Sequence, residues 1–213
     1  MSDFHIVMAD IVKSRSYDGG VLIDSFSRVV HRCNEMYENE ILSPYTITLG
    51  DEFQGIVKSL KGAIETIFYL EETLLGEDLS FQLRYVVVFD KIGTPINREI
   101  AHGMTGPGLA LAREMLTKKQ RGKPRFQFKL SYGDDFELNM LFRLVESLVS
   151  CWNKKDYLLI KEMISNDDDQ RVAEKFGKNR SQVWKRRKTL RIDEYNILKE
   201  LIYNQIQTLE ALA

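Results

Sequence analysis

The sequence predicts an α+β fold, in which an antiparallel sheet covered by helices is followed by an all-α helix-turn-helix domain. Two observations lead to this expectation. Strand-like and helix-like hydrophobic patterns alternate up to residue 132, whereas only helical periodicity follows as far as residue 213. A strongly basic segment with helix-turn-helix spacing lies in that second stretch. We therefore expect two domains, residues 1–132 and residues 133–213.

The composition is that of an ordinary globular chain. The 213 residues are 44% hydrophobic and 29% charged, and the formal net charge of −1 gives the whole molecule no nucleic-acid signature. The two cysteines, Cys33 and Cys151, match no metal or redox spacing. No apolar run approaches the roughly 20 residues of a membrane span, and the N-terminus has no features of a signal peptide. A cytoplasmic protein without a membrane partner is expected.

The first domain reads in the order strand, helix, strand, strand, helix, strand, helix, strand. The strands are predicted at residues 4–12, 46–49, 53–57, 81–90 and 126–130, and the helices at residues 21–41, 59–75 and 109–116. Pro44 is expected to end the connection after the first helix. The order is close to the β-α-β-β-α-β ferredoxin-like arrangement with an addition at its end.

Two acidic positions stand at strand ends. Gly50 breaks an apolar run and is followed by Asp51 and Glu52, which predicts a hairpin with carboxylates at its tip. Asp10 ends the first predicted strand. If the two strands are neighbours, Asp10 and Asp51 meet at one edge of the sheet. Because close carboxylates repel, a hard cation such as Mg²⁺ is the usual compensation.

Four segments resemble the palm-like catalytic domain of class III and GGDEF-type nucleotide cyclases. Residues 9–14 (ADIVKS) and 48–53 (TLGDEF) look like its two acidic segments. Residues 83–90 (LRYVVVFD) look like its next strand, and residues 106–113 (GPGLALAR) like its Gly-led helix. The resemblance implies a cyclase-palm-like sheet with two metal ions that hold a nucleoside triphosphate.

The resemblance also implies ligands. The metal ions would be held by Asp10, the main-chain carbonyl of Ile11, and Asp51. The residues expected to meet the nucleotide are Lys13, Arg15, Glu52 and Arg113. The alternative for Lys13 and Arg15 is that they lie in a surface loop without contacting a phosphate. The alternative for Glu52 is that it is solvated and binds no ligand.

The cyclase pattern is incomplete in this chain. Ala110 stands where the family carries an Asn, and the family's transition-state Arg falls on or beside Glu114, with Arg113 one position away. Such groups stabilise charge at the α-phosphate during cyclisation. The resemblance therefore supports metal or nucleotide binding better than cyclisation. Nearly the whole chain is also similar to the SatD family of small bacterial proteins, which implies architecture more than function.

The segment from residue 171 to residue 188 has the spacing of a helix-turn-helix. A small residue, Ala173, lies four positions before Gly177, and the apolar Val183 lies six positions after it. The small residue lets two helices approach, and glycine takes the turn with positive φ. The side chains expected to face the core are Val172, Phe176, Val183 and Leu190, and Ser181 is expected near the start of the second helix.

Positive charge is concentrated in the same segment. Residues 171–191 contain nine basic residues and one acidic residue, which predicts phosphate contacts. Arg180, Gln182 and Lys185 are placed to reach base edges, and Ser181 to contact a phosphate. The predicted DNA-binding set is Lys178, Arg180, Ser181, Gln182, Lys185 and Arg186. A helical hairpin that uses these charges only for solubility is the alternative.

A long final helix is predicted at residues 192–212, and it either covers the helix-turn-helix or pairs with a second copy. A homodimer is expected, since helix-turn-helix proteins commonly bind DNA in pairs. Three functions remain open. They are a DNA-binding regulator with a cyclase-like sensor domain, a Mg²⁺-dependent enzyme acting on nucleoside triphosphates, and a protein-interaction module.

Overall fold

The computed structural model describes residues 2–14, 17, 19–77, 79, 81–118 and 122–212. The elements of its sheet region are β1 (Ser2–Ile11), α1 (Gly19–Met36), β2 (Ile41–Ile47), β3 (Glu52–Val57), α2 (Leu60–Gly76), β4 (Leu83–Ile92), α3 (Pro107–Thr117) and β5 (Phe126–Leu130). The helices that follow are α4 (Phe136–Val149), the short 3-10 helix η2 (Lys154–Asp156), α5 (Tyr157–Ser165), α6 (Asp169–Lys175), α7 (Arg180–Leu190) and α8 (Ile192–Glu210).

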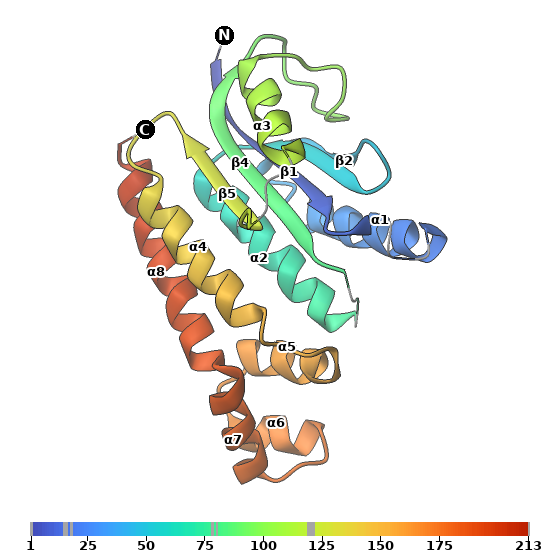
Figure 1. Ribbon diagram of the computed structural model, residues 1–213, viewed down its shortest axis with the longest axis vertical. Helices are drawn as coiled ribbons and strands as arrows, with labels where there is room; N and C mark the ends of the chain where they lie inside the picture. Colours follow the sequence, from blue (N-terminus) through green and yellow to red (C-terminus); the bar gives the residue numbers. More distant parts are fainter. Residues whose placement is uncertain are drawn as a thin grey trace.

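The five strands form one sheet in the order β2-β3-β1-β4-β5 (Figure 1). The central strand β1 pairs antiparallel with both β3 and β4. The prediction of a wholly antiparallel sheet is wrong at the far edge, because β5 runs parallel to β4. The reason is the connection: α3 carries the chain from β4 back to the start of the sheet, so the next strand runs the same way as β4.

The sheet is buried on both faces, and the alternation of side chains along β1 divides the core in two. Ile6 and Met8 belong to a cluster completed by α3. Val7 and Ala9 point the other way, into a larger cluster with α1 and α2. This second cluster extends without a break into the C-terminal helices.

The helical half packs directly against α2. The ring of Phe68 lies 5.6 Å from that of Phe142 in α4 and 6.2 Å from that of Tyr195 in α8, measured between centroids. Figure 1 shows α4 and α8 side by side along the molecule, with α5, α6 and α7 at its far end. The boundary at residue 132 falls in the loop between β5 and α4, and the division into two domains stays a prediction.

The second strand differs from the prediction. It begins at Ile41, five residues before the predicted start at residue 46. Helix α1 ends at Met36, five residues earlier than expected. Pro44 lies inside β2 instead of ending a connection. Proline is tolerated there because β2 is an edge strand and its register shifts between Ser43 and Thr46. None of the helices in the described part of the chain combines the length and apolar character that crossing a membrane requires.

Candidate functional site

The two acidic segments meet at one edge of the sheet. Asp10, near the end of β1, lies opposite Glu52, the first residue of β3. The backbone N–H of Ile11 donates a hydrogen bond of 2.8 Å to the carbonyl of Asp51. Gly50 supplies the positive φ, 82°, that the turn before β3 requires. The antiparallel pairing of β1 with β3 therefore places Asp10 beside the hairpin tip.

Asp10 is a partly buried carboxylate whose hydrogen bonding is incomplete. Its Oδ1 atom is buried without a hydrogen-bond partner among the described residues, and its Oδ2 lies 3.6 Å from Nη1 of Arg84. Burial raises the pKa of Asp10, and the nearby charges of Asp51 and Glu52 raise it further, whereas Arg84 and Lys123 oppose the shift. A cation bound at this position would favour the charged form of the Asp10 carboxyl group.

Glu52 and Arg113 bind each other. Glu52 is only 7% exposed. The alternative of a solvated side chain, which the sequence left open, is therefore wrong. Its carboxylate forms an ion pair with Arg113 and accepts a hydrogen bond of 2.8 Å from the hydroxyl of Thr48. Arg113 also lies 3.4 Å from Oε1 of Gln54. In this state two of the four residues predicted to meet a nucleotide are paired with one another.

The donor set suits a hard cation only in part. No group of three His, Cys, Asp or Glu side chains within the described ranges is arranged to hold a metal ion. The carboxylate of Glu52 is already balanced by Arg113. Asp10 and Asp51 remain, together with the carbonyl oxygen of Ile11. The partnerless Oδ1 of Asp10 is the observation that favours a cation there.

The loop after β1 contributes less. Lys13 is exposed and has a positive φ of 57°, which is uncommon for a residue with a side chain. Arg15 lies outside the described residues. Two basic residues near Asp10, Arg84 and Lys123, were missed from the sequence because they come from β4 and from the loop before β5.

The basic segment forms two helices joined by residues 176–179. Gly177 adopts a positive φ of 60° in this turn. The expected core side chains are buried at Val172, Val183 and Leu190, and Phe176 is partly buried. Helix α7 therefore presents its other faces to solvent.

A capping box formed by Asn179, the residue before α7, and Gln182 stabilises the start of the helix. The side chain of Asn179 accepts the N–H of Gln182 at 2.9 Å, and Oε1 of Gln182 accepts the N–H of Asn179 at 3.1 Å. Ser181, expected near the cap, lies one residue inside the helix and donates its hydroxyl to Asn179 at 2.8 Å.

The basic residues on and just before α7 include both paired and exposed side chains. Arg186 is held by both oxygens of Asp156, and Arg187 is buried against Asp169. By contrast, Lys178, Arg180 and Lys185 are exposed, and their side chains have no partner within the described residues. A groove beside α7 is lined by Lys178, Gln182 and Arg186 and also by Lys154 and Lys155. These two lysines, 23 or more residues away in sequence, were missed because only folding brings η2 beside α7.

The final helix leaves Ile197 and Leu201, one turn apart, exposed on α8. The homodimer stays a prediction.

Two of three comparisons with known proteins find a similar family or structure. The sequence model of the SatD family matches residues 4–204, a range that runs from β1 into α8. No protein with a curated description matches the sequence. A similar solved structure is that of a bacterial light-regulated adenylyl cyclase, with 13% sequence identity, a TM-score of 0.44, and coverage of 60% of this chain and 75% of that chain.

Proposed function

The chain belongs to the SatD family, and we propose that it is a DNA-binding regulatory protein that reads DNA with α7. The observation that carries this proposal is the charge of α7, which has five basic residues and no acidic residue. Three cations on or just before this helix, Lys178, Arg180 and Lys185, are exposed and bind no other side chain in the described ranges. They are therefore available to phosphates and bases.

The geometry suits insertion of α7 into a major groove. In a helix-turn-helix the N-terminal residues of the second helix contact base edges. Arg180, Gln182 and Lys185 occupy that part of α7. Its N-terminal N–H groups carry partial positive charge, which favours a nearby phosphate. In this proposal Lys178 and Ser181 contact the backbone, whereas Arg186 is neutralised by its ion pair with Asp156 and adds no net charge.

Fluorescence anisotropy with labelled genomic DNA fragments at several salt concentrations tests the proposal. Binding is expected to weaken steeply with salt, because phosphate contacts release counterions. Lys178→Ala is expected to reduce the salt slope by about one, and Arg180→Ala to cost about 1–3 kcal/mol on the preferred fragment. The matched control is Arg143→Ala, an exposed arginine on α4. Salt-independent binding, or equal losses in Arg143→Ala and Arg180→Ala, would contradict the proposal.

A second function is supported by one observation, the buried and partnerless Oδ1 of Asp10. We propose that Asp10 and Asp51, with the carbonyl of Ile11, would hold a divalent cation, and that this cation would bind the phosphates of a nucleoside triphosphate. The bound ion would neutralise phosphate charge. Arg113 would then exchange Glu52 for a phosphate. Ala110 and Glu114 stand where the cyclase family has its Asn and Arg. We therefore propose that the site binds the nucleotide, and an enzyme that turns the nucleotide over is the alternative.

Thermal and urea unfolding with Mg²⁺ and each of the common nucleoside triphosphates tests this site. A ligand at about 100 times its Kd is expected to stabilise the native state by about 2.7 kcal/mol. Asp51→Asn is expected to abolish that gain. Asp167→Asn, an exposed carboxylate between α5 and α6 at the far end of the molecule (Figure 1), is expected to retain it. Equal stabilisation of wild type and Asp51→Asn would place the nucleotide elsewhere.

A further inference from the structure

The groove beside α7 is bordered on its other side by η2 and the start of α5. Its volume of about 600 Å³ is in the range of ligand-binding clefts. Among the described residues that line it, Lys154, Lys155, Lys178 and Arg186 are basic and only Asp156 is acidic. The groove therefore has an excess of positive charge, which favours an anionic ligand.

One ion pair in the groove is neutral. Nε of Arg186 donates to Oδ1 of Asp156 at 3.1 Å, and Nη2 of Arg186 binds Oδ2. Asp156 is buried, so the pair is part of the wall. The excess charge comes instead from Lys154 and Lys155 on η2 and from Lys178 in the turn before α7, and all three are exposed.

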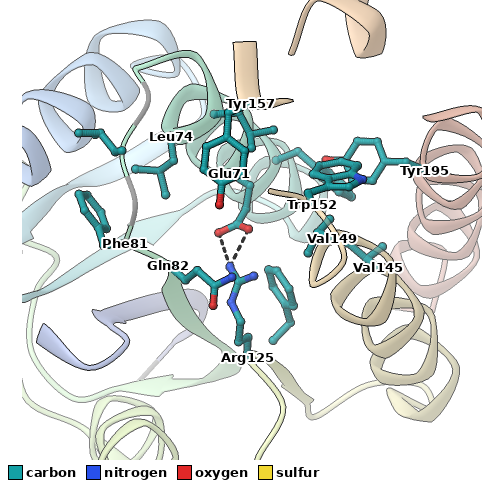
Figure 2. Close-up of a pocket in the computed structure, with 14 residues that line it drawn as sticks. Glu71, Leu74, Phe81, Gln82, Arg125, Val145, Val149, Trp152, Tyr157 and Tyr195 are labelled. Atoms are coloured by element: carbon teal, nitrogen blue, oxygen red, sulfur yellow. Dashed lines mark hydrogen bonds and ion pairs between the residues drawn. The ribbon is translucent and has the colours of Figure 1, made fainter. Parts of the chain in front are cut away.

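Two contacts fix η2 beside α7. Asp156, the last residue of η2, is held by Arg186. Trp152, two residues before η2, donates its indole Nε1–H to the carbonyl of Leu190, the last residue of α7, at 2.8 Å. The ring of Trp152 lines a small, largely apolar pocket of about 40 Å³, where it lies 5.1 Å from the ring of Tyr195 between centroids (Figure 2). Because residues 152–156 are anchored at both ends, the lysines between the anchors are positioned for a ligand before it binds.

The groove follows one flank of α7. Gln182 and Arg186, one turn apart, line it, whereas Arg180 and Trp184, also one turn apart, do not. A helix in the major groove of DNA lies between the backbones of the two strands. If α7 enters a major groove, the strand on the Gln182 side passes beside η2. Leu158, exposed at the start of α5, offers an apolar surface to the deoxyribose rings of that strand.

We propose that the groove holds the sugar-phosphate backbone of one DNA strand, with Lys154 and Lys155 as phosphate contacts outside α6 and α7. This inference rests on the proposed function of α7 in DNA binding. It adds a second element, η2, that fixes the orientation of α7 on the duplex. Because phosphates are the same in every sequence, the two lysines contribute affinity without sequence preference.

Fluorescence anisotropy at several salt concentrations tests the phosphate contact. Lys155→Ala is expected to lower the salt slope by about one and to weaken binding about fivefold to tenfold at about 0.1 M salt. The loss should be the same on the preferred fragment and on unrelated DNA. Lys161→Ala, at an exposed lysine of α5 that does not line the groove, is the matched control and should bind as the wild type does.

The outcomes separate this inference from the proposed function. If Arg180→Ala weakens binding while Lys155→Ala matches Lys161→Ala, the groove does not hold the backbone, and the proposed function stands. A loss in Lys155→Ala that is confined to the preferred fragment would indicate a base contact and would also overturn the inference. If the wild type shows no salt-dependent binding, both the function and the inference are wrong.

A negative charge placed in the groove tests whether DNA occupies it. Leu158→Glu is expected to weaken binding about tenfold or more, because the carboxylate repels a phosphate. Leu144→Glu, at a similarly exposed leucine on α4, should leave binding unchanged. Equal affinities of the two variants for DNA would be incompatible with a backbone in the groove.

Neutral methylphosphonate linkages, introduced one at a time into the preferred fragment, identify the contacted phosphate. At one position the loss caused by the methylphosphonate and the loss caused by Lys155→Ala should not add, because both changes remove the same contact. Additive losses at every position of the fragment would refute a contact between Lys155 and the backbone.

Discussion

Replacing Arg187 with alanine is expected to lower the free energy of unfolding by about 3–5 kcal/mol. Arg187 is only 5% exposed. Its Nε lies 2.8 Å from Asp169, and its other nitrogens donate to the carbonyls of Met163 and Asn166 at 2.9 and 2.7 Å. The substitution would leave a poorly exposed carboxylate and two carbonyls without their donor. These partners lie on α5, on α6 and between them. The lost stability therefore comes from the packing of α7 against α5 and α6.

Urea unfolding followed by circular dichroism measures this effect. The matched control is Arg171→Ala, whose side chain is 78% exposed and pairs with Asp168 at the surface. Surface pairs of this kind contribute at most about 1 kcal/mol. The double variant Arg187→Met, Asp169→Leu is expected to recover much of the loss, because it removes both buried charges. An Arg187→Ala protein as stable as Arg171→Ala would show that Arg187 does not hold α7 in place.

Acidification is expected to destabilise the protein through His5, by up to about 3 kcal/mol. Burial lowers the pKa of His5 from 6.5 to about 4, although a hydrogen bond to the backbone of Lys58 opposes the shift. At a pH between those two values, His5 is protonated in the unfolded chain and neutral in the folded chain. The contribution of neutral His5 is therefore fully present above the unfolded pKa and is lost as the pH falls towards the folded value.

Urea unfolding at about pH 7 and about pH 5 isolates this term, and the expected loss over that interval is about 2 kcal/mol. His5→Gln is expected to remove that part of the pH dependence. Its cost at neutral pH is the lost contact with Tyr132, whose hydroxyl lies 2.8 Å from Nε2 of His5. His31→Gln, on the exposed face of α1, is the control and should retain the wild-type slope. Identical slopes in His5→Gln and wild type would exclude His5 as the cause.

Local patterns were sufficient for the elements and for part of the candidate site. The alternation of apolar residues predicted β5 with its observed bounds, Phe126–Leu130. The position of Asp10 and Asp51 at strand ends was enough to expect them at one edge of the sheet if their strands were neighbours, and the antiparallel pairing of β1 with β3 meets that condition. The spacing around Gly177 likewise predicted which side chains of α6 and α7 are buried.

Local patterns could not predict which residues far apart in the chain pair with one another. Glu52 looked like an exposed turn residue, but it is buried because Arg113, 61 residues later, neutralises it. Arg186 looked like a DNA contact, and it is held by Asp156. The pocket beside Trp152 has no sequence signature, since its walls come from elements far apart in the chain.

The sequence by itself determined the order of the elements, the acidic strand ends and the basic helix, because hydrophobic periodicity and turn residues act over a few neighbours. Only the tertiary structure decided which charges are free and which are paired. Charge pairing depends on distances between residues that the fold brings together, and burial makes an unpaired charge costly enough that such pairs form. That is why Lys178, Arg180 and Lys185 remain available to a ligand while Arg186 and Arg187 do not.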